Sequence, residues 1–241
     1  VVLLVVLAAL EQIYLLQEYS MADRRFGELS GPFVEPARGG TPSSLIIMLH
    51  GWGADGNDLA DLAYPFSVRF PGAAFFVPHA PEACPMNPAG RQWFDIEDRV
   101  TGPVIAAPVI EQAIAAAADE LNLDNAAIAL TGFSQGGMMS LHCGLRMTGK
   151  PSAIVSFSGA LLVYDDLVAL ADDAKQDLPP VQLIHGTQDL VVPFEMMDVS
   201  ADILGDIGVS VTRVPREGLG HGIDADALTA AIDFLALHLP A

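Results

Sequence analysis

A serine, an aspartate and a histidine, in that order along the chain, have surroundings suited to nucleophilic catalysis. Ser134 lies in residues 131–137, Thr-Gly-Phe-Ser-Gln-Gly-Gly, which contain the pattern G-x-S-x-G. An apolar run at 126–130 predicts a strand before it, and 135–146 a helix after it. Glycines two residues either side of the serine allow a tight turn without side-chain clashes. Such a turn would hold the hydroxyl above a sheet, beside a helix N-terminus that favours negative charge.

A serine hydroxyl needs a base to take its proton, and His221 is the histidine best placed to be that base. It lies in a Gly-rich loop, 217–222, between the last predicted strand and the last predicted helix. Such a loop can suspend an imidazole over the serine. The other histidines after Ser134 fall in a packed helix, at a strand end before the best acid, and near the C-terminus: His142, His185 and His238.

Asp189 is the acid that we expect to orient the base. It follows the predicted strand 181–184 through a polar turn. In the order serine, acid, histidine, its role would be to accept the Nδ1–H of His221, fixing the tautomer and stabilising the imidazolium. Asp198 is the competing acid, but it falls within a predicted helix, away from the strand ends. The alternative for Asp189 is a cap of the following turn.

Acyl transfer also needs two donors for the tetrahedral oxygen. We predict that they are the backbone N–H groups of Gln135, which follows the nucleophile, and of Trp52, in the Gly-rich loop 49–56. That loop lacks the Lys-Ser/Thr pair of a phosphate-binding P-loop. The side chain of His50 is interpreted as structural.

The elements that must position these residues alternate between short apolar runs and longer helical segments, which predicts an α/β fold around a mostly parallel sheet. The expected strands are 45–49, 73–77, 126–130, 153–157, 181–184 and 209–214. The expected helices are 57–66, 103–121, 135–146, 194–204 and 224–237. Ligands of such sheets bind at the carboxyl ends of the strands, where the polar segments above fall.

Composition narrows the class of protein further. The chain has 241 residues, 51% hydrophobic and 17% charged, which excludes disorder and fits a sheet covered by helices on both faces. Its 11 Lys and Arg against 30 Asp and Glu give a formal charge of -19. This balance argues against nucleic-acid binding, and anionic membrane surfaces should repel the protein. We expect one domain over 21–241.

The first twenty residues, 1–20, differ from the rest. Their apolar run, 1–10, is too short to span a bilayer and lacks the features of a signal peptide. We interpret 1–20 as an upstream extension or an artefact; if native, it would be an apolar helix needing a second subunit or the rim of the active site as partner. Cys84, in a Pro-rich loop, and Cys143, in a predicted helix, are interpreted as free thiols, which favours a cytoplasmic location.

Five segments in order across about 45–237 resemble the phospholipase/carboxylesterase family of α/β hydrolases, which includes the acyl-protein thioesterases. They are the L-H-G-x-G-x-D segment at 49–55, W-F-D at 93–95, G-F-S-Q-G-G at 132–137, H-G-x-x-D-x-x-V-P at 185–193 and Gly-His at 220–221. The resemblance implies an α/β-hydrolase fold without a large cap domain, activity on carboxylic esters or thioesters, and no metal or organic cofactor. The family pattern does not require residues 1–20.

The predicted function is a serine carboxylesterase that hydrolyses small-molecule esters of short to medium acyl chain through an acyl-enzyme. The residues expected to line the acyl pocket are Trp52, Trp93, Phe94, Leu190 and Val191, although core packing is an equal alternative for Trp93 and Phe94. An acyl-protein thioesterase or lysophospholipase could use the same site, and a silent binding protein is the alternative from another class. Histidine spacing predicts no metal site. Stable membrane insertion is not expected, and a homodimer is left open.

Overall fold

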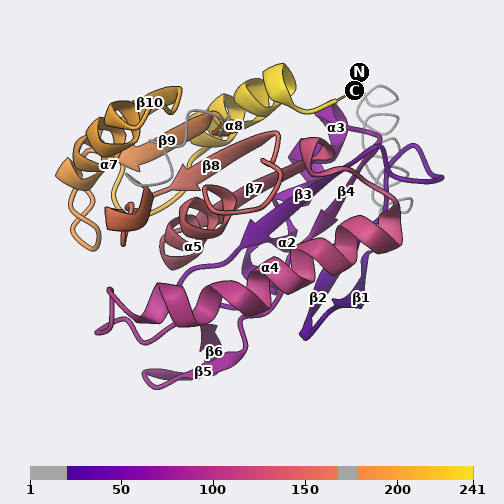
Figure 1. The fold of residues 1–241 in the computed structure, drawn as a ribbon, viewed down its shortest axis with the longest axis horizontal. Coiled ribbons are helices and arrows are strands. Elements are labelled where there is room, and N and C mark those ends of the chain that lie inside the picture. Colours follow the sequence, from indigo (N-terminus) through magenta and orange to yellow (C-terminus); the bar gives the residue numbers. More distant parts are fainter. Residues whose placement is uncertain (1–20, 168–177, 241) are drawn as a thin grey trace, which may run out of the picture.

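An eight-stranded sheet forms the centre of the molecule in the computed structural model, which describes residues 21–167 and 178–240 (Figure 1). Its strands lie in the order β1-β2-β4-β3-β7-β8-β9-β10. β2 is antiparallel to both β1 and β4, and every pairing from β4 to β10 is parallel. The bounds are β1 Met21–Phe26, β2 Leu29–Val34, β3 Ser44–Leu49, β4 Ala73–Phe76, β7 Ile128–Phe133, β8 Ala153–Phe157, β9 Val181–Gly186 and β10 Val211–Arg216.

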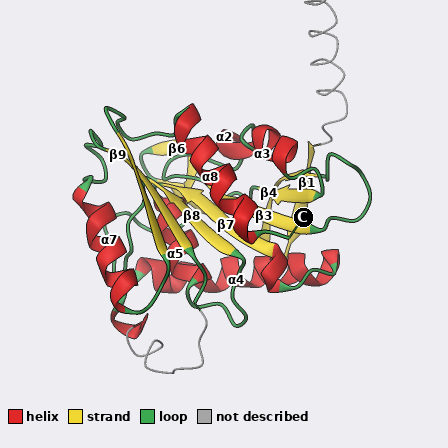
Figure 2. Ribbon diagram, turned by 90° about the horizontal axis from the view of Figure 1, so that it is seen from above, coloured by secondary structure: helices red, strands yellow, loops and turns green. Residues whose placement is uncertain are grey.

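Helices cover both faces of this sheet. Figure 2 shows α4, α5 and α7 on one face and α2, α3 and α8 on the other. The bounds are α2 Asn57–Ala60, α3 Ala63–Arg69, α4 Gly102–Leu121, α5 Gln135–Gly144, α7 Glu195–Asp206 and α8 Ala225–His238, with a short 3-10 helix at Asn125–Ala127. A small hairpin of β5 (Glu82–Cys84) and β6 (Asn87–Gln92) lies outside the main sheet.

Strand β3 shows why a sheet covered on both faces needs a continuous apolar run. All six of its residues are buried. Leu45, Ile47 and Leu49 join the core beneath α4 and α5, whereas Ile46 and Met48 join the core beneath α3 and α8. Successive side chains of a strand point to opposite faces, so each face receives its own set of apolar groups.

The predicted α/β fold with a mostly parallel sheet and helices on both faces is confirmed, and most expected elements are present within two residues of their predicted ends. The helix expected at 57–66 is instead two helices, α2 and α3, and the sheet gains the edge hairpin of β1 and β2. That hairpin carries Arg24, Arg25 and Pro32, so its sequence lacks the apolar run by which we recognised the central strands. The predictions for residues 1–20 lie outside the described residues.

Two further observations concern the cysteines and the length of the helices. Cys84 and Cys143 are both buried and form no disulfide. Cys84 ends strand β5, where a loop was expected. Within the described ranges, no helix is long and apolar enough to cross a membrane.

Candidate active site

Ser134 occupies a strained turn between β7 and α5. Its backbone has a φ of 54°, in the region that side chains other than glycine rarely adopt. A Cβ on Gly136 would lie 1.9 Å from the backbone oxygen of Leu49, and one on Gly132 would lie 2.3 Å from Gly136. Only glycine fits at these two positions, so the G-x-S-x-G pattern is required by the close approach of β3, β7 and α5.

His221 and Asp189 meet through two loops at the carboxyl edge of the sheet. His221 Nδ1 lies 2.7 Å from Asp189 Oδ2. The loop after β9 and the loop after β10 are joined by a hydrogen bond from the Gln188 amide to the Leu219 carbonyl, 2.9 Å long. A Cβ on Gly186 would lie 2.2 Å from that carbonyl, so this glycine permits the contact that brings the two loops together.

The Asp189 carboxylate is almost fully paired. Oδ1 accepts hydrogen bonds from the amides of Val191 (2.8 Å) and Val192 (2.9 Å). Burial alone would raise the pKa of Asp189, but the hydrogen bonds from His221 and from these two amides outweigh it and lower the pKa. His185 Nε2, which bonds the Val192 carbonyl at 2.9 Å, lies 3.3 Å from Oδ2. The carboxylate is therefore held ionised with one oxygen facing His221.

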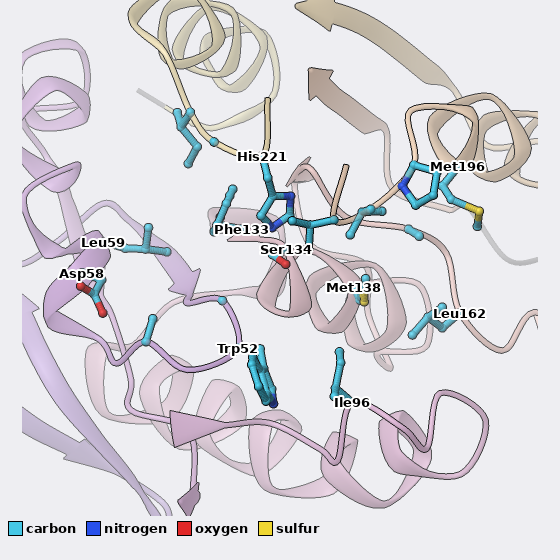
Figure 3. A pocket seen from close by; sticks show the side chains of 18 of the residues that line it. Trp52, Asp58, Leu59, Ile96, Phe133, Ser134, Met138, Leu162, Met196 and His221 are labelled. Carbon is cyan, nitrogen blue, oxygen red and sulfur yellow. The ribbon is translucent and has the colours of Figure 1, made fainter. Parts of the chain in front are cut away.

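The site is a cavity of about 760 Å³ at the carboxyl ends of the strands. Ser134 and His221 both line it, and Figure 3 shows the His221 ring beside the Ser134 hydroxyl. No hydrogen bond joins these two described side chains; such bonds are often long in unliganded sites. The Phe133 ring packs against His221, with ring centroids 4.8 Å apart.

The two predicted oxyanion donors belong to segments that border this cavity. Trp52 lines it, and Gln135 is the first residue of α5, directly after Ser134. The first amides of a helix have no acceptor within the helix, and the hydrogen bonds of the described residues give neither the Trp52 nor the Gln135 amide a protein acceptor. Neither amide hydrogen is therefore committed to an acceptor among the described residues.

Apolar side chains form most of the cavity wall. Figure 3 shows Met138, Leu162 and Met196 on one side of Ser134, and Asp58 with Leu59 on the other. The remaining lining residues are Gly51, Ala54, Leu62, Ile96, Arg99, Phe133, Ala160, Val191, Val192, Pro193, Gly222 and Ile223. Pockets of about 300–1,000 Å³ with apolar walls and few polar groups are typical of small-molecule sites.

Only two of the five residues expected in the acyl pocket line this cavity, Trp52 and Val191. The prediction for Trp93 and Phe94 needs correction, because both are buried in the core beneath α4, with 1% and 2% exposed. Leu190 also needs correction, because it points into solvent with 95% of its surface exposed. Core packing was the alternative considered for Trp93 and Phe94, and the structure favours it.

Sequence reasoning missed Met138, Leu162 and Met196 as lining residues. Met138 has a signal, because it lies one helical turn after Ser134 and therefore on the same side of α5. Leu162 and Met196 reach the cavity from segments after β8 and β9, and no local pattern marks them. The two charged lining residues, Asp58 and Arg99, were also missed.

Three of the rival residues lie away from this site. Asp198 is on α7, half exposed, and its Oδ1 lies 3.5 Å from Arg213 Nη1. His142 is buried within α5, and His238 ends α8. In the described part of the chain, no three His, Cys, Asp or Glu side chains are grouped to hold a metal ion.

A strained serine directly after a central strand, with a histidine on the same cavity wall and an aspartate 2.7 Å from that histidine, is the arrangement typical of α/β hydrolases with this sheet order. A sequence model of the phospholipase/carboxylesterase family matches residues 31–239, so the chain belongs to that family. It is an enzyme of a hydrolase family that contains both esterases and thioesterases.

Two curated relatives and two solved structures illustrate the relationship. Acyl-protein thioesterase 1 of Gibberella zeae is 30% identical, covering 87% of this chain and 96% of that protein. Esterase YpfH of Escherichia coli K12 is 30% identical, covering 81% and 83%. The crystal structure of esterase PE8 superposes with a TM-score of 0.81 at 37% identity, covering 88% and 99%. SOBER1 of Arabidopsis thaliana shares the fold, with a TM-score of 0.71, 23% identity and coverage of 80% and 97%.

Proposed function

We propose that the protein is a serine carboxylesterase that hydrolyses short- to medium-chain carboxylic esters through Ser134, His221 and Asp189. The observation that carries the proposal is the 2.7 Å contact of His221 Nδ1 with Asp189 Oδ2, together with Ser134 and His221 on the wall of one apolar cavity. A neutral imidazole whose Nδ1–H is held by a carboxylate presents Nε2 as a proton acceptor.

In the first half of the reaction, Ser134 Oγ attacks the ester carbonyl carbon while His221 Nε2 takes the hydroxyl proton. The carbonyl electron pair moves to its oxygen, and the amides of Trp52 and Gln135 donate hydrogen bonds to that oxyanion. Asp189 stabilises the resulting imidazolium. Collapse of the intermediate breaks the bond to the alcohol oxygen, which takes the proton from His221 and leaves an acyl ester on Ser134.

In the second half, a water molecule replaces the alcohol. His221 Nε2 takes a proton from the water as its oxygen attacks the acyl carbon. The same two amides bind the second oxyanion. Collapse breaks the bond to Ser134 Oγ, and the proton on His221 returns to the serine, releasing the carboxylic acid. No metal or organic cofactor enters either step.

The cavity wall supports a placement of the acyl and alcohol parts of the ester on opposite sides of Ser134. We assign the acyl chain to the side of Met138, Leu162 and Met196, because these three side chains are uncharged and unbranched methionine side chains adapt to chains of different length. The alcohol then leaves toward Asp58, where the wall is more polar. Activity should rise with acyl length until this side is filled, and then fall.

A thioesterase acting on lipidated protein, or a lysophospholipase, is the second candidate. The observation that favours it is the 30% identity to acyl-protein thioesterase 1 of Gibberella zeae over nearly all of that protein. Both reactions pass through the same tetrahedral intermediate, so the same residues serve either. A cytoplasmic location and a homodimer stay predictions.

Hydrolysis of p-nitrophenyl esters from two to sixteen carbons, beside a Ser134→Ala control, tests the proposal. We expect an optimum at short or medium chains and no turnover by the control. An S-acylated peptide assayed in parallel separates the two candidates by their kcat/KM. A flat profile from acetate to long acyl would contradict the assigned pocket, and full activity in the control would exclude Ser134 as nucleophile. Failure of wild type on all of these substrates would favour a silent binding protein.

A further inference from the structure

The loop that carries the Trp52 amide, residues 50–54, is hydrogen-bonded to strand β6 through the backbone of Gly53 and Ala54. The Gly53 amide donates to the Arg91 carbonyl at 2.8 Å, and the Arg91 amide donates to the Ala54 carbonyl at 2.7 Å. The Asn87 side chain donates to the Gly53 carbonyl at 2.7 Å. The small hairpin outside the main sheet thus has a function in the fold, because it supports this loop.

The indole N–H groups of Trp52 and Trp93 add two further hydrogen bonds, one on each side of the Trp52 amide. Trp52 Nε1 donates to Gln92 Oε1 at 2.9 Å, and Trp93 Nε1 donates to the His50 carbonyl at 2.9 Å. Trp93 is 1% exposed, so its bond to His50 is shielded from bulk water, and the Gln92 acceptor is 5% exposed. The backbone from His50 to Trp52 is therefore fixed from the β6 side.

The His50 ring fixes the same loop from within. Its Nδ1 lies 2.8 Å from the Gly51 carbonyl, and its Nε2 accepts from the Ala80 amide at 3.0 Å. A carbonyl only accepts and an amide only donates, so the ring is neutral with its proton on Nδ1. Burial lowers the pKa of His50, which favours this neutral form.

The Gln135 side chain links the segment after β6 to the turn that holds Ser134. Its Oε1 accepts from the Trp93 amide at 2.9 Å, and its Nε2 donates to the Phe94 carbonyl at 2.8 Å. Gln135 is fully buried, and its side-chain groups face the backbone of the segment after β6. The residue whose amide is one oxyanion donor is thus bonded, through Trp93, to the loop that carries the other.

We propose that Trp93, held by the Gln135 side chain and bonded to the His50 carbonyl, is a positioning residue that sets the separation of the two oxyanion donors. We call Gln92, Trp93, Phe94 and the side chain of Gln135 the brace. This inference rests on the proposed function, because it assigns the Trp52 and Gln135 amides to the oxyanion. None of the brace side chains touches the substrate cavity.

The geometry distinguishes this role from simple core packing. A packing residue needs volume, whereas the Trp93 indole also donates its one polar hydrogen to the His50 carbonyl, two residues from the Trp52 amide. Donors stabilise an oxyanion only when they lie about 2.7–3.1 Å from it, so a small shift of this loop weakens the transition state more than the ground state. The expected signature is a loss in kcat with little change in KM.

The test uses Trp93→Phe, which removes the indole N–H but keeps an aromatic ring, and Gln135→Met, which removes both side-chain bonds. Rates are normalised to active serine titrated by a fluorophosphonate. Loss of one whole oxyanion donor costs about 10²–10³ in kcat, so we expect displaced donors to cost roughly 10-fold or more in each variant. KM should stay within about threefold. The Ki of an alkyl trifluoromethyl ketone, whose adduct with Ser134 carries an oxyanion, should rise in parallel with the loss of kcat.

Phe75→Leu is the matched control, because Phe75 is a fully buried aromatic residue in the core on the opposite face. It should lower stability yet keep kcat and the Ki of the ketone. Folded Trp93→Phe and Gln135→Met proteins with wild-type kcat and Ki would overturn the brace, and so would equal losses in Phe75→Leu. If the wild type hydrolyses esters and Ser134→Ala does not, the proposed function is supported whatever the results for Trp93→Phe and Gln135→Met. The esterase function and the positioning role of Trp93 can therefore fail independently.

Discussion

Replacing the acid by its amide, Asp189→Asn, tests the orientation of the base most sharply. The two carboxylate oxygens have different partners: Oδ1 accepts from the amides of Val191 and Val192 at 2.8 and 2.9 Å, and Oδ2 faces His221 Nδ1 at 2.7 Å. A side-chain amide must place its oxygen at the Oδ1 position, because its NH₂ group would otherwise face two N–H donors. The NH₂ group then takes the Oδ2 position and points at His221.

The imidazole can accept this hydrogen bond only with Nδ1 unprotonated, which moves its proton to Nε2. An Nε2–H cannot take the proton of Ser134, so the base is in the wrong tautomer although the geometry is intact. The loss should resemble that of the same substitution in serine proteases, about 10⁴ in kcat, equivalent to about 5 kcal/mol of transition-state stabilisation. KM should change little, because the carboxylate does not line the cavity.

The assay is kcat for p-nitrophenyl butyrate, corrected for active serine by fluorophosphonate titration. Asp198→Asn is the matched control, because Asp198 is the competing acid, half exposed on α7 beside Arg213. It should keep kcat within about twofold, as expected for an exposed ion pair. The reasoning is refuted if Asp189→Asn retains more than about a tenth of wild-type kcat, given the 10⁴ expected, or if the control loses as much.

Three other predictions concern stability and substrate length. Burial lowers the pKa of His142 to about 4, so unfolding takes up a proton between about pH 6.5 and 4. The free energy of unfolding, measured by urea titration, should therefore fall by up to about 3 kcal/mol as the pH is lowered across this window. An equal fall in His142→Gln would show that His142 is not the cause. Gly136→Ala should lower the free energy of unfolding by at least about 3 kcal/mol and abolish activity, because its Cβ would lie 1.9 Å from a backbone oxygen of β3. Gly205→Ala on α7, where a Cβ meets nothing within 4 Å, should raise the free energy of unfolding by about 0.5–1 kcal/mol and so raise the melting temperature. A Gly136→Ala protein more stable than the Gly205→Ala protein would refute the argument. Leu162→Phe should shift the optimum of the p-nitrophenyl ester series to shorter chains, whereas Leu190→Ser should leave it unchanged, and a shift only in the latter would place the acyl chain elsewhere.

The parts of this fold that could be predicted are those specified by local sequence. The apolar run of β3, the glycines around Ser134 and the Gly-rich loop of His221 each follow from a short-range requirement: burial on both faces, a tight turn, or a flexible connection. Ser134, Asp189 and His221 come together because the carboxyl ends of parallel strands share one edge of the sheet. Their catalytic roles stay predictions until the variants are measured.

The parts that could not be predicted depend on contacts between distant segments. Trp93 and Phe94 have the composition of a pocket wall, and nothing near them in sequence reveals that Gln135, about forty residues later, bonds both of their backbones. Leu162 and Met196 likewise reach the cavity because of where the segments after β8 and β9 pass. Aromatic residues occur both in cores and in pocket walls, so composition alone does not distinguish the two environments.

The segment after β9 shows how one hydrogen-bond pattern decides both the acid and its neighbours. Asp189 Oδ1 accepts from the amides two and three residues later, which turns the carboxylate inward and leaves it 5% exposed. The same tight turn directs Leu190 outward, 95% exposed, and brings Val191 to the edge of the cavity. The turn-capping role considered for Asp189 and the catalytic role are therefore not alternatives, since the amides that the carboxylate caps also help to keep it ionised and aimed at His221.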